Sequence, residues 1–461
     1  MEGRALNDLK KDLMFGYHLR LALESFKRTP GLTLLMLCTI AVGISTCIVT
    51  LTVYEGTSND PIRWKSGQLY AVTMDSWDPN EAANPKRPNL PPTQLAYKDA
   101  RFLLSSAIPA RKAAMFRTQD VISGGGAADG QPVPISTRVT GADFFAMFDV
   151  PFLYGGAWST QLDQGAEPVI VISRELNEKL FGGANSVGRT LRWNNRDFRV
   201  NGVLNTWLPL PKFFDLNRGA FDALEDAYVP FGWAEALGRF PNGGRVACWR
   251  NDPIGSFQQF LQSDCVWLQM WVQLNDAESR GRMQAFLDAY WSDQRQAGRF
   301  GRPRNNRLTN VRQWLIDQEV VDNDNRMLVG VAFAFLAICL LNTVGMLLAK
   351  FLKSAPGAGI RRALGATRAQ IFWQYLTEAG LLAAGGAALG LLLGAFGLQG
   401  VHALYVWGSI GPGGYQELTH VGWGSVFWAL TLALVAALGA GSYPAWRLAR
   451  LPPATYLKSE Q

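Results

Sequence analysis

The sequence predicts an α-helical membrane protein with four transmembrane helices and a large α+β domain between the first and the second of them. Three observations support this fold class. The 461 residues contain four apolar tracts, each with the ~20 residues needed to cross about 30 Å of hydrocarbon. Basic residues flank these tracts unevenly. The long segment after the first tract alternates between strand-like and helix-like patterns.

The apolar tracts set the order of the predicted segments. The first tract is too long and begins too far from residue 1 for a signal peptide, and no small-residue cleavage site follows it. Before it, apolar residues recur at helical spacing from Leu9 to Leu21, which predicts an amphipathic helix on the membrane surface. The predicted segments are an amphipathic helix (1–30), spans at 31–55, 326–352, 375–401 and 421–446, an external domain (56–325), a short helix between spans (353–374), an external loop (402–420) and a tail (447–461).

Lys and Arg residues are distributed asymmetrically across the predicted spans. They cluster before the first span, between the second and third, and after the fourth, whereas residues 402–420 contain none. Because cytoplasmic loops are enriched in Lys and Arg, both termini and residues 353–374 are predicted to be cytoplasmic, and residues 56–325 external. Topology in a lipid bilayer therefore accounts for the net charge of +7 and argues against a nucleic-acid partner.

The external segment carries the pattern of an α+β domain. Residues 169–182 predict a β-branched strand and an amphipathic helix, 190–204 predict two strands around an Asn–Asn turn, and 265–291 predict another strand and helix. Residues 78–92 and 207–211 are predicted loops. Acidic neighbours such as Glu225 and Asp226 are predicted to be solvated surface residues.

The segment before the second span is predicted to form one helix with it. Apolar residues recur at helical spacing through residues 311–331, from Trp314 to Met327. A helix that begins outside the bilayer and continues into it would couple movement of the external domain to movement of the span.

Several residues in and near the spans are candidates for packing. Gly386, Gly390 and Gly394 are four residues apart and predict a ridge that another helix can approach closely. Asn342, a polar residue in the second span, is predicted to hydrogen-bond to another helix, with a transport role as the alternative.

The five cysteines divide by location. Cys38, Cys47 and Cys339 fall within spans and are predicted to be small apolar fillers. Cys248 and Cys265 lie in the external segment, where an oxidising compartment permits a disulfide and two free buried thiols are the alternative.

Motifs of catalysis are missing from the sequence. No G-x-x-x-x-G-K-[ST], H-E-x-x-H or G-x-S-x-G occurs, and the three histidines are scattered. The chain is therefore predicted to be a non-catalytic subunit without a metal or cofactor of its own.

Three stretches resemble the MacB/FtsX-type permeases of ABC transporters. GIRRALGAT at 359–367 matches the short cytoplasmic helix of that family, PAWRLARLPPATYL at 444–457 matches its C-terminal ending, and LRLALESFKRTPG at 19–31 matches its entry to the first span. FDVPFLYGGAWS and PVIVISRELNEKLFGGANSVGRTLRW resemble the periplasmic domain of the same family. The resemblance covers nearly the whole chain and implies that the external α+β domain is periplasmic.

The resemblance implies a docking role for the short helix. In the family this helix enters a groove on a separate ATPase subunit, which binds ATP and Mg²⁺. A tight turn at Gly365 is expected, and the alternative is that the arginines only enforce topology and bind anionic lipid. The implied ATPase-docking residues are Arg361, Arg362, Leu364, Gly365, Thr367 and Arg368.

The implied function is that of a permease subunit in the inner membrane of a didermic bacterium. ATP-driven movement of the cytoplasmic helices would reach the periplasmic domain through the second span, a mechanism called mechanotransmission. An adaptor and an outer-membrane channel would complete an export path. The alternatives are FtsX-like signalling to a cell-wall hydrolase and release of lipoproteins; the size of the segment 56–325 favours the MacB-like function.

The chain departs from the family pattern at cytoplasmic positions. Acidic residues of the family are replaced at Gly357, Pro452 and Thr455. Pro356 and Gly357 predict that the second span ends at or before Ala355 and that a flexible joint follows. A flexible joint on both sides of a homodimer would transmit force poorly. The predicted partner is therefore a second permease, similar but not identical, paired through the first and second spans.

Overall fold

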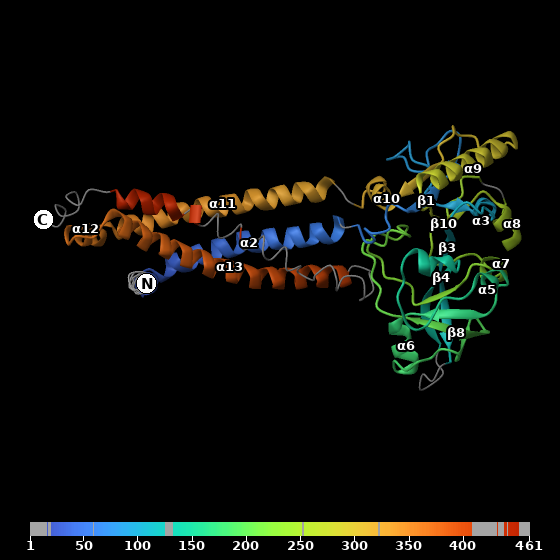
Figure 1. Ribbon diagram of the computed structural model, residues 1–461, viewed down its shortest axis with the longest axis horizontal. Helices are drawn as coiled ribbons and strands as arrows, with labels where there is room; N and C mark the ends of the chain where they lie inside the picture. Colours follow the sequence, from blue (N-terminus) through green and yellow to red (C-terminus); the bar gives the residue numbers. More distant parts are fainter. Residues whose placement is uncertain are drawn as a thin grey trace, which may run out of the picture. The chain divides into compact units, whose positions relative to one another are not determined.

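The computed structural model describes residues 16, 20–58, 60–124, 132–250, 253–320, 323–407, 431, 438–439 and 441–450. They belong to two compact units (Figure 1). The sheet domain consists chiefly of Ser58–Val321, and the helical unit contains the chain before and after it.

The helical unit is built from long apolar helices. These are α2 (Pro30–Ser58), α11 (Asn323–Lys353), the short α12 (Ala355–Ala363) and α13 (Arg368–Trp407), and residues 20–28 and 441–449 are also helical. Within the described ranges, three stretches could cross a membrane by length and composition: Pro30–Tyr54, Met327–Lys353 and Arg368–Val401. The first two agree with the predicted spans to within one residue at each end, and the third contains the predicted span 375–401 but begins seven residues earlier, at Arg368. Most of the fourth predicted span and of the N-terminal amphipathic helix lies outside the described residues.

Three glycines of α13 face α2 of the same chain. The pairs are Gly386 with Ile40, Gly390 with Ile44, and Gly394 with Ile48. A Cβ atom on Gly390 would lie 2.9 Å from Cβ of Ile44 and 3.0 Å from the backbone oxygen of Ala41. Because real Cβ atoms do not come this close, Gly386 and Gly390 are what lets the two helices approach, whereas a Cβ atom on Gly394 would make an ordinary contact with Ile48 at 3.4 Å.

A neighbouring face of α2 packs on α11. Gly43 of α2 lies against Leu336 and Cys339 of α11, where an added Cβ would be 3.0 Å from the leucine. The Cys47 thiol donates a hydrogen bond to the backbone oxygen of Ala332 over 3.3 Å. The helix α2 therefore contacts both α11 and α13.

We expect Gly390→Leu to destabilise the helical unit, because the larger side chain must push α2 and α13 apart. Overpacking of this kind costs roughly 1–3 kcal/mol. The thermal midpoint of the detergent-solubilised chain should fall. Gly400→Leu is the matched control on the same helix, since nothing lies within 4 Å of a Cβ added there. Equal midpoints for the two variants would contradict the close packing.

The sheet domain is organised around an 11-stranded sheet. Its main strand order is β11-β1-β10-β3-β4-β9-β6-β8-β5, with β2 beside β10 and β7 beside β3 and β8. Figure 1 labels β1, β10, β3, β4 and β8 of this series. The strands are β1 (Leu69–Thr73), β2 (Leu95–Ala96), β3 (Arg111–Ser123), β4 (Val133–Thr140), β5 (Phe152–Gly155), β6 (Val169–Ile172), β7 (Thr190–Trp193), β8 (Arg196–Leu204), β9 (Ala227–Pro230), β10 (Val266–Gln273) and β11 (Arg307–Asn310). The pairs β4–β9 and β6–β8 are parallel, and the other pairs are antiparallel.

Helices cover the sheet, and two apolar cores result. Successive side chains of a strand point to opposite faces, so Ala114 and Phe116 of β3 join one core while Ala113 and Met115 join the other. The helices are α3 (Tyr97–Leu104), α4 (Asp143–Met147), α5 (Thr160–Gln164), α6 (Arg174–Phe181), α7 (Trp233–Ala236), α8 (Phe257–Gln262), α9 (Ala277–Gln296) and α10 (Val311–Asp317). The mixture of helices and a mostly antiparallel sheet agrees with the predicted α+β class.

The local predictions for this domain are confirmed where the sequence contains residues that favour a turn or a helix cap. β6 is followed by α6, whose N-cap is Ser173 and whose C-cap, Gly182, has a φ of +63°. β7 and β8 form a hairpin whose turn residues Asn194 and Asn195 have φ of +48° and +63°. β10 is followed by α9, as predicted, and residues 78–92 and 207–211 contain no helix or strand.

The prediction of one continuous helix through residues 311–331 is wrong. α10 ends at Asp317 and α11 begins at Asn323, and Glu319 between them has a φ of +55°. Tertiary packing overrides the helical spacing here: Trp314 of α10 is buried and its indole donates a hydrogen bond to the Phe213 backbone oxygen over 2.9 Å. α10 is therefore part of the sheet domain and not an extension of the span.

Candidate functional site

The first candidate site is the α12 corner, defined as residues 354–370. α11 ends at Lys353, in agreement with the prediction that the second span stops at or before Ala355. Pro356 and Gly357, where a flexible joint is expected, both lie in α12, and the break between α11 and α12 is at Ser354. Pro356 occupies the first turn of the helix, where a missing backbone N–H costs nothing.

The sequence of the corner explains its sharp turn. Gly365 has a φ of +105°, which favours glycine. Its N–H donates to the Arg362 oxygen, and the Ala366 N–H donates to the Arg361 oxygen, over 3.1 and 3.0 Å. These two bonds form a Schellman motif that ends α12.

A second cap follows at once and starts α13. The Thr367 backbone N–H donates to Oε1 of Gln370, and the Gln370 N–H donates to Oγ1 of Thr367, over 2.9 and 3.3 Å. This capping box places Arg368 at the first position of α13 and not in the short helix. The predicted segment 353–374 is therefore divided between α12 and the beginning of α13.

The corner exposes both basic and apolar side chains. Arg361 is half-buried and donates a hydrogen bond from Nη1 to Oε1 of Gln374 over 2.6 Å. Leu364 is 83% exposed, and Arg368 is exposed beside it in the chain. Ile360 and Trp373 are more than half exposed and were not predicted to be site residues. Ile360 lies within the basic motif GIRRALGAT, and an apolar residue next to two arginines was the sequence signal that could have identified it as a site residue.

A buried ion pair lies behind the corner. Nζ of Lys350 on α11 is 2.6 Å from Oε1 of Glu378 on α13, and both side chains are at least 96% buried. The Ser25 hydroxyl donates to the same carboxylate oxygen over 2.6 Å. Sequence reasoning missed Glu378, although a carboxylate within an apolar helix is a strong indication of function or pairing.

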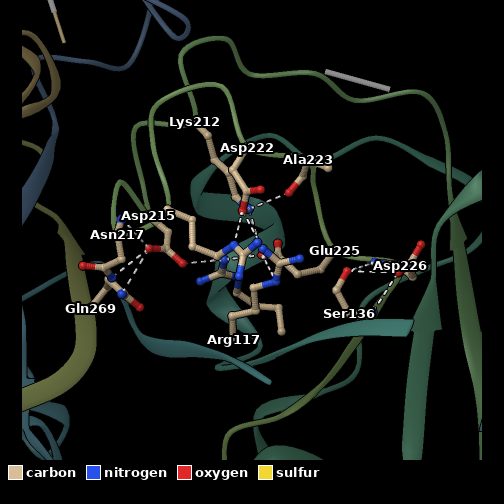
Figure 2. A network of polar contacts seen from close by, with 12 residues as sticks. Arg117, Ser136, Lys212, Asp215, Asn217, Asp222, Ala223, Glu225, Asp226 and Gln269 are labelled. Carbon is tan, nitrogen blue, oxygen red and sulfur yellow. Dashed lines mark hydrogen bonds and ion pairs between the residues drawn. The ribbon is translucent and has the colours of Figure 1, made fainter. Parts of the chain in front are cut away.

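The second candidate site is a network of buried charges in the sheet domain (Figure 2). Arg138 of β4 donates to Oε1 of Glu225 over 2.5 Å and to Oδ2 of Asp215 over 2.8 Å. Lys212 donates to the same Glu225 oxygen over 2.8 Å. Arg138, Lys212 and Glu225 are each at most 1% exposed. The prediction that Glu225 is a solvated surface residue is therefore wrong.

This network attaches residues 205–226 to the sheet. Arg117 of β3 pairs with Asp222 at 2.5 Å, and Gln269 of β10 donates to Asp215 over 3.2 Å (Figure 2). Burial alone would raise the pKa of Glu225, but Arg138 and Lys212 hold it well below its usual range. Charges of both signs balance in the network, and its role is to position the long connection, not to react.

The remaining predicted residues lie apart from these two sites. Cys248 and Cys265 form a disulfide that joins the preceding loop to the start of β10. Asn342 is exposed on α11 and makes no hydrogen bond to another helix within the described part of the chain. Gly386, Gly390 and Gly394 lie at the α2–α13 contact described above.

The fold defines a class of protein: a membrane protein with a large α+β domain inserted between its first two spans and a capped short helix after the second. Two family models match the chain, the MacB-like periplasmic core domain over residues 33–290 and the FtsX-like permease C-terminal region over residues 329–453. The chain therefore belongs to the family of MacB/FtsX-type ABC transporter permeases.

Curated relatives match much of the chain at low identity. A macrolide export ATP-binding/permease protein, MacB of Wolinella succinogenes, is 23% identical over 96% of this chain and 60% of its own length. The pyoverdine export ATP-binding/permease protein PvdT of Pseudomonas aeruginosa is 25% identical over 69% of this chain and 41% of its own length. The chain thus spans less than two thirds of these relatives.

Among solved structures, the periplasmic region of MacB from Actinobacillus actinomycetemcomitans aligns with 57% of this chain and 96% of its own. The identity is 13% and the TM-score is 0.35.

Proposed function

We propose that this chain is the permease component of a MacB-like exporter in a bacterial inner membrane, and that an ABC ATPase docks on the α12 corner. The observation that carries the proposal is the corner itself. Two successive caps hold it, and it exposes Leu364 and Ile360 beside Arg361 and Arg362. Arginines next to exposed apolar side chains are typical of a protein interface. In this arrangement both termini are cytoplasmic and the sheet domain is periplasmic.

The proposed mechanism is mechanotransmission. The ATPase binds ATP and Mg²⁺, and its closure displaces α12; no cofactor is assigned to this chain. The displacement reaches α11 through Ser354, and the buried pair of Lys350 and Glu378 carries it to α13. α11 then passes it across the membrane toward the sheet domain. An adaptor and an outer-membrane channel would extend the path.

We favour export over the other functions of related permeases. The names of the two relatives described above assign them to macrolide and pyoverdine export. The MacB-like periplasmic core is matched over most of the sheet domain. Signalling to a cell-wall hydrolase and lipoprotein release are the alternatives, and identification of the cargo would distinguish them from export.

A second permease chain is proposed to pack on α11. The exposed residues of this helix include a seam with alternating steps of four and three residues, the spacing of a helix–helix interface. Its small residues permit close approach, and Asn342 at its centre would be costly against lipid alone. The seam consists of Val331, Phe335, Ile338, Asn342, Gly345 and Ala349.

The second chain need not differ from the first. The prediction of a non-identical partner depended on a flexible joint at Pro356 and Gly357, and those residues are helical. The proposal is therefore a pair of permeases, identical or similar, without a mechanical reason for asymmetry.

Site-specific photocrosslinking in cells tests both contacts in one experiment. A photoreactive residue at Leu364 is expected to capture an ABC ATPase, and one at Asn342 is expected to capture a second permease chain, whose mass reports whether it is identical. Lys179, exposed on α6, is the control position and should capture no ATPase. Capture of lipid alone at Leu364 would overturn the docking site, and capture of lipid alone at Asn342 would overturn the seam.

A further inference from the structure

A polar cavity of about 370 Å³ lies beside the α12 corner. Four segments of the helical unit form it: residues 21–29, the end of α11, the beginning of α12 and the first turns of α13. α2 begins at Pro30 and α11 ends at Lys353, so the cavity lies where the apolar helices end. It is therefore at the level of the membrane surface on the α12 side.

Cationic side chains outnumber carboxylates in this cavity. Its carboxylates are Glu24 and Glu378. Glu378 is already paired with Lys350 and accepts a hydrogen bond from Ser25. Glu24 is half-exposed, and its Oε1 atom lies 3.8 Å from Nε of Arg20, a residue that does not line the cavity. The cationic lining residues are Arg28, Lys350, Lys353 and Arg361.

Three of these cations have spare capacity to bind an anion. In the described part of the chain, Arg28, Lys353 and Arg361 have no carboxylate within ion-pair distance, and the side-chain partner of Arg361 is the neutral amide of Gln374. The Lys350 ammonium has three N–H donors, and its contacts are Glu378 and the ring of Phe26, 4.6 Å away. The cavity thus has a net positive lining with unused donors.

We propose that this cavity binds the phosphodiester headgroup of an anionic membrane phospholipid. Guanidinium and ammonium groups bind phosphate oxygens through charge-assisted hydrogen bonds. Basic pockets between membrane helices on the cytoplasmic side suit lipid headgroups. The first turns of α2 expose Leu34 and Leu35, which offer an apolar surface for acyl chains and favour a lipid over free phosphate.

The lipid would occupy the place where α11 turns into α12. It would contact the helix before α2, the end of α11 and Arg361 of α12 at the same time. The headgroup would therefore hold the corner against the N-terminal helix, whatever protein docks on α12. This proposal does not depend on the ATPase contact.

Native mass spectrometry of the detergent-solubilised full chain tests the proposal. The chain is titrated with phosphatidylglycerol or with zwitterionic phosphatidylcholine. One phosphatidylglycerol per chain should bind at least about tenfold more tightly than phosphatidylcholine, and Arg28→Gln combined with Lys353→Gln should abolish this preference. Both residues are exposed, so the variant is expected to fold with an unchanged thermal midpoint.

A matched control removes the same charge elsewhere. Lys27→Gln combined with Arg447→Gln changes two exposed cations that do not line the cavity. Its lipid preference should equal that of the unmodified chain. Equal binding of both lipids, or an equal loss in both double variants, would overturn the proposal. Displacement of phosphatidylglycerol by an equal concentration of inorganic phosphate would show that the ligand is free phosphate and overturn the lipid assignment.

Discussion

Glu225→Ala is expected to lower the free energy of unfolding of the sheet domain by about 3–5 kcal/mol, the usual cost of removing one partner from a buried ion pair. Glu225 is fully buried, and one of its oxygens accepts hydrogen bonds from both Arg138 and Lys212. Without it, two cations remain in an apolar interior with only Asp215 and Asp222 as carboxylate partners. Residues 205–226 should then detach from β3 and β4.

Proteolysis of the full-length chain in increasing urea would measure this effect. The urea concentration at which the sheet domain becomes cleavable should fall by about 1 M or more. Glu178→Ala is the matched control, because Glu178 also has an arginine partner at 3.0 Å but lies on the surface of α6. Exposed pairs contribute about 0–1 kcal/mol. Equal shifts for the two variants would show that the buried network does not anchor the connection.

Arg361→Glu combined with Arg362→Glu is expected to abolish co-purification of the ATPase while the chain still inserts in the membrane. The change reverses the sign of two neighbouring charges on α12, so the proposed charge-assisted contacts of these arginines with the ATPase would be lost and replaced by repulsion. Losing one partner of a close charge pair at an interface typically costs 2–5 kcal/mol or more, so binding should weaken by at least about thirtyfold. Hydrolysis of ATP stimulated by the permease should fall with it.

The control for this variant is Arg447→Glu combined with Arg450→Glu, which reverses two exposed charges in, and directly after, the helix of residues 441–449 in the same unit. It should leave ATPase recovery unchanged. If recovery is also unchanged for the α12 variant, the arginines serve topology and the docking proposal fails. Because Arg361 also lines the lipid cavity, the lipid proposal is tested separately with Arg28→Gln and Lys353→Gln, which leave Arg361 unchanged.

The parts of the fold that sequence predicts well are those encoded by neighbours in the chain. An Asn–Asn turn, a Ser N-cap and a Gly C-cap specify the β7–β8 hairpin and α6 through local backbone geometry. The membrane spans are also predictable from sequence, because a helix needs a long run of apolar residues to cross a bilayer. The tight turn at Gly365 was predictable for the same reason.

Features that depend on distant residues were not predictable. Glu225 looks like a surface acid in its local sequence, and only the fold brings Arg138 and Lys212 to it. Helical spacing suggested a continuous helix after Trp314, but the indole of that residue is held by the sheet domain. Likewise, the glycine spacing in α13 predicts a close contact with another helix but does not indicate which helix makes it.

The contact between α2 and α13 has a periodic geometry. Ile40, Ile44 and Ile48 of α2 lie against Gly386, Gly390 and Gly394 of α13. Because the residue numbers increase in the same direction along both helices, the helices run parallel. Four residues are close to one turn, a rise of about 5.4–6 Å. A slide of one turn would bring Ile40 opposite Gly390 and Ile44 opposite Gly394, but it would set Ile48 against Leu398. A shorter slide would also set an isoleucine against a bulkier residue. The spacing of the glycines therefore fixes one register of the two helices, in which each of the three isoleucines lies against a glycine.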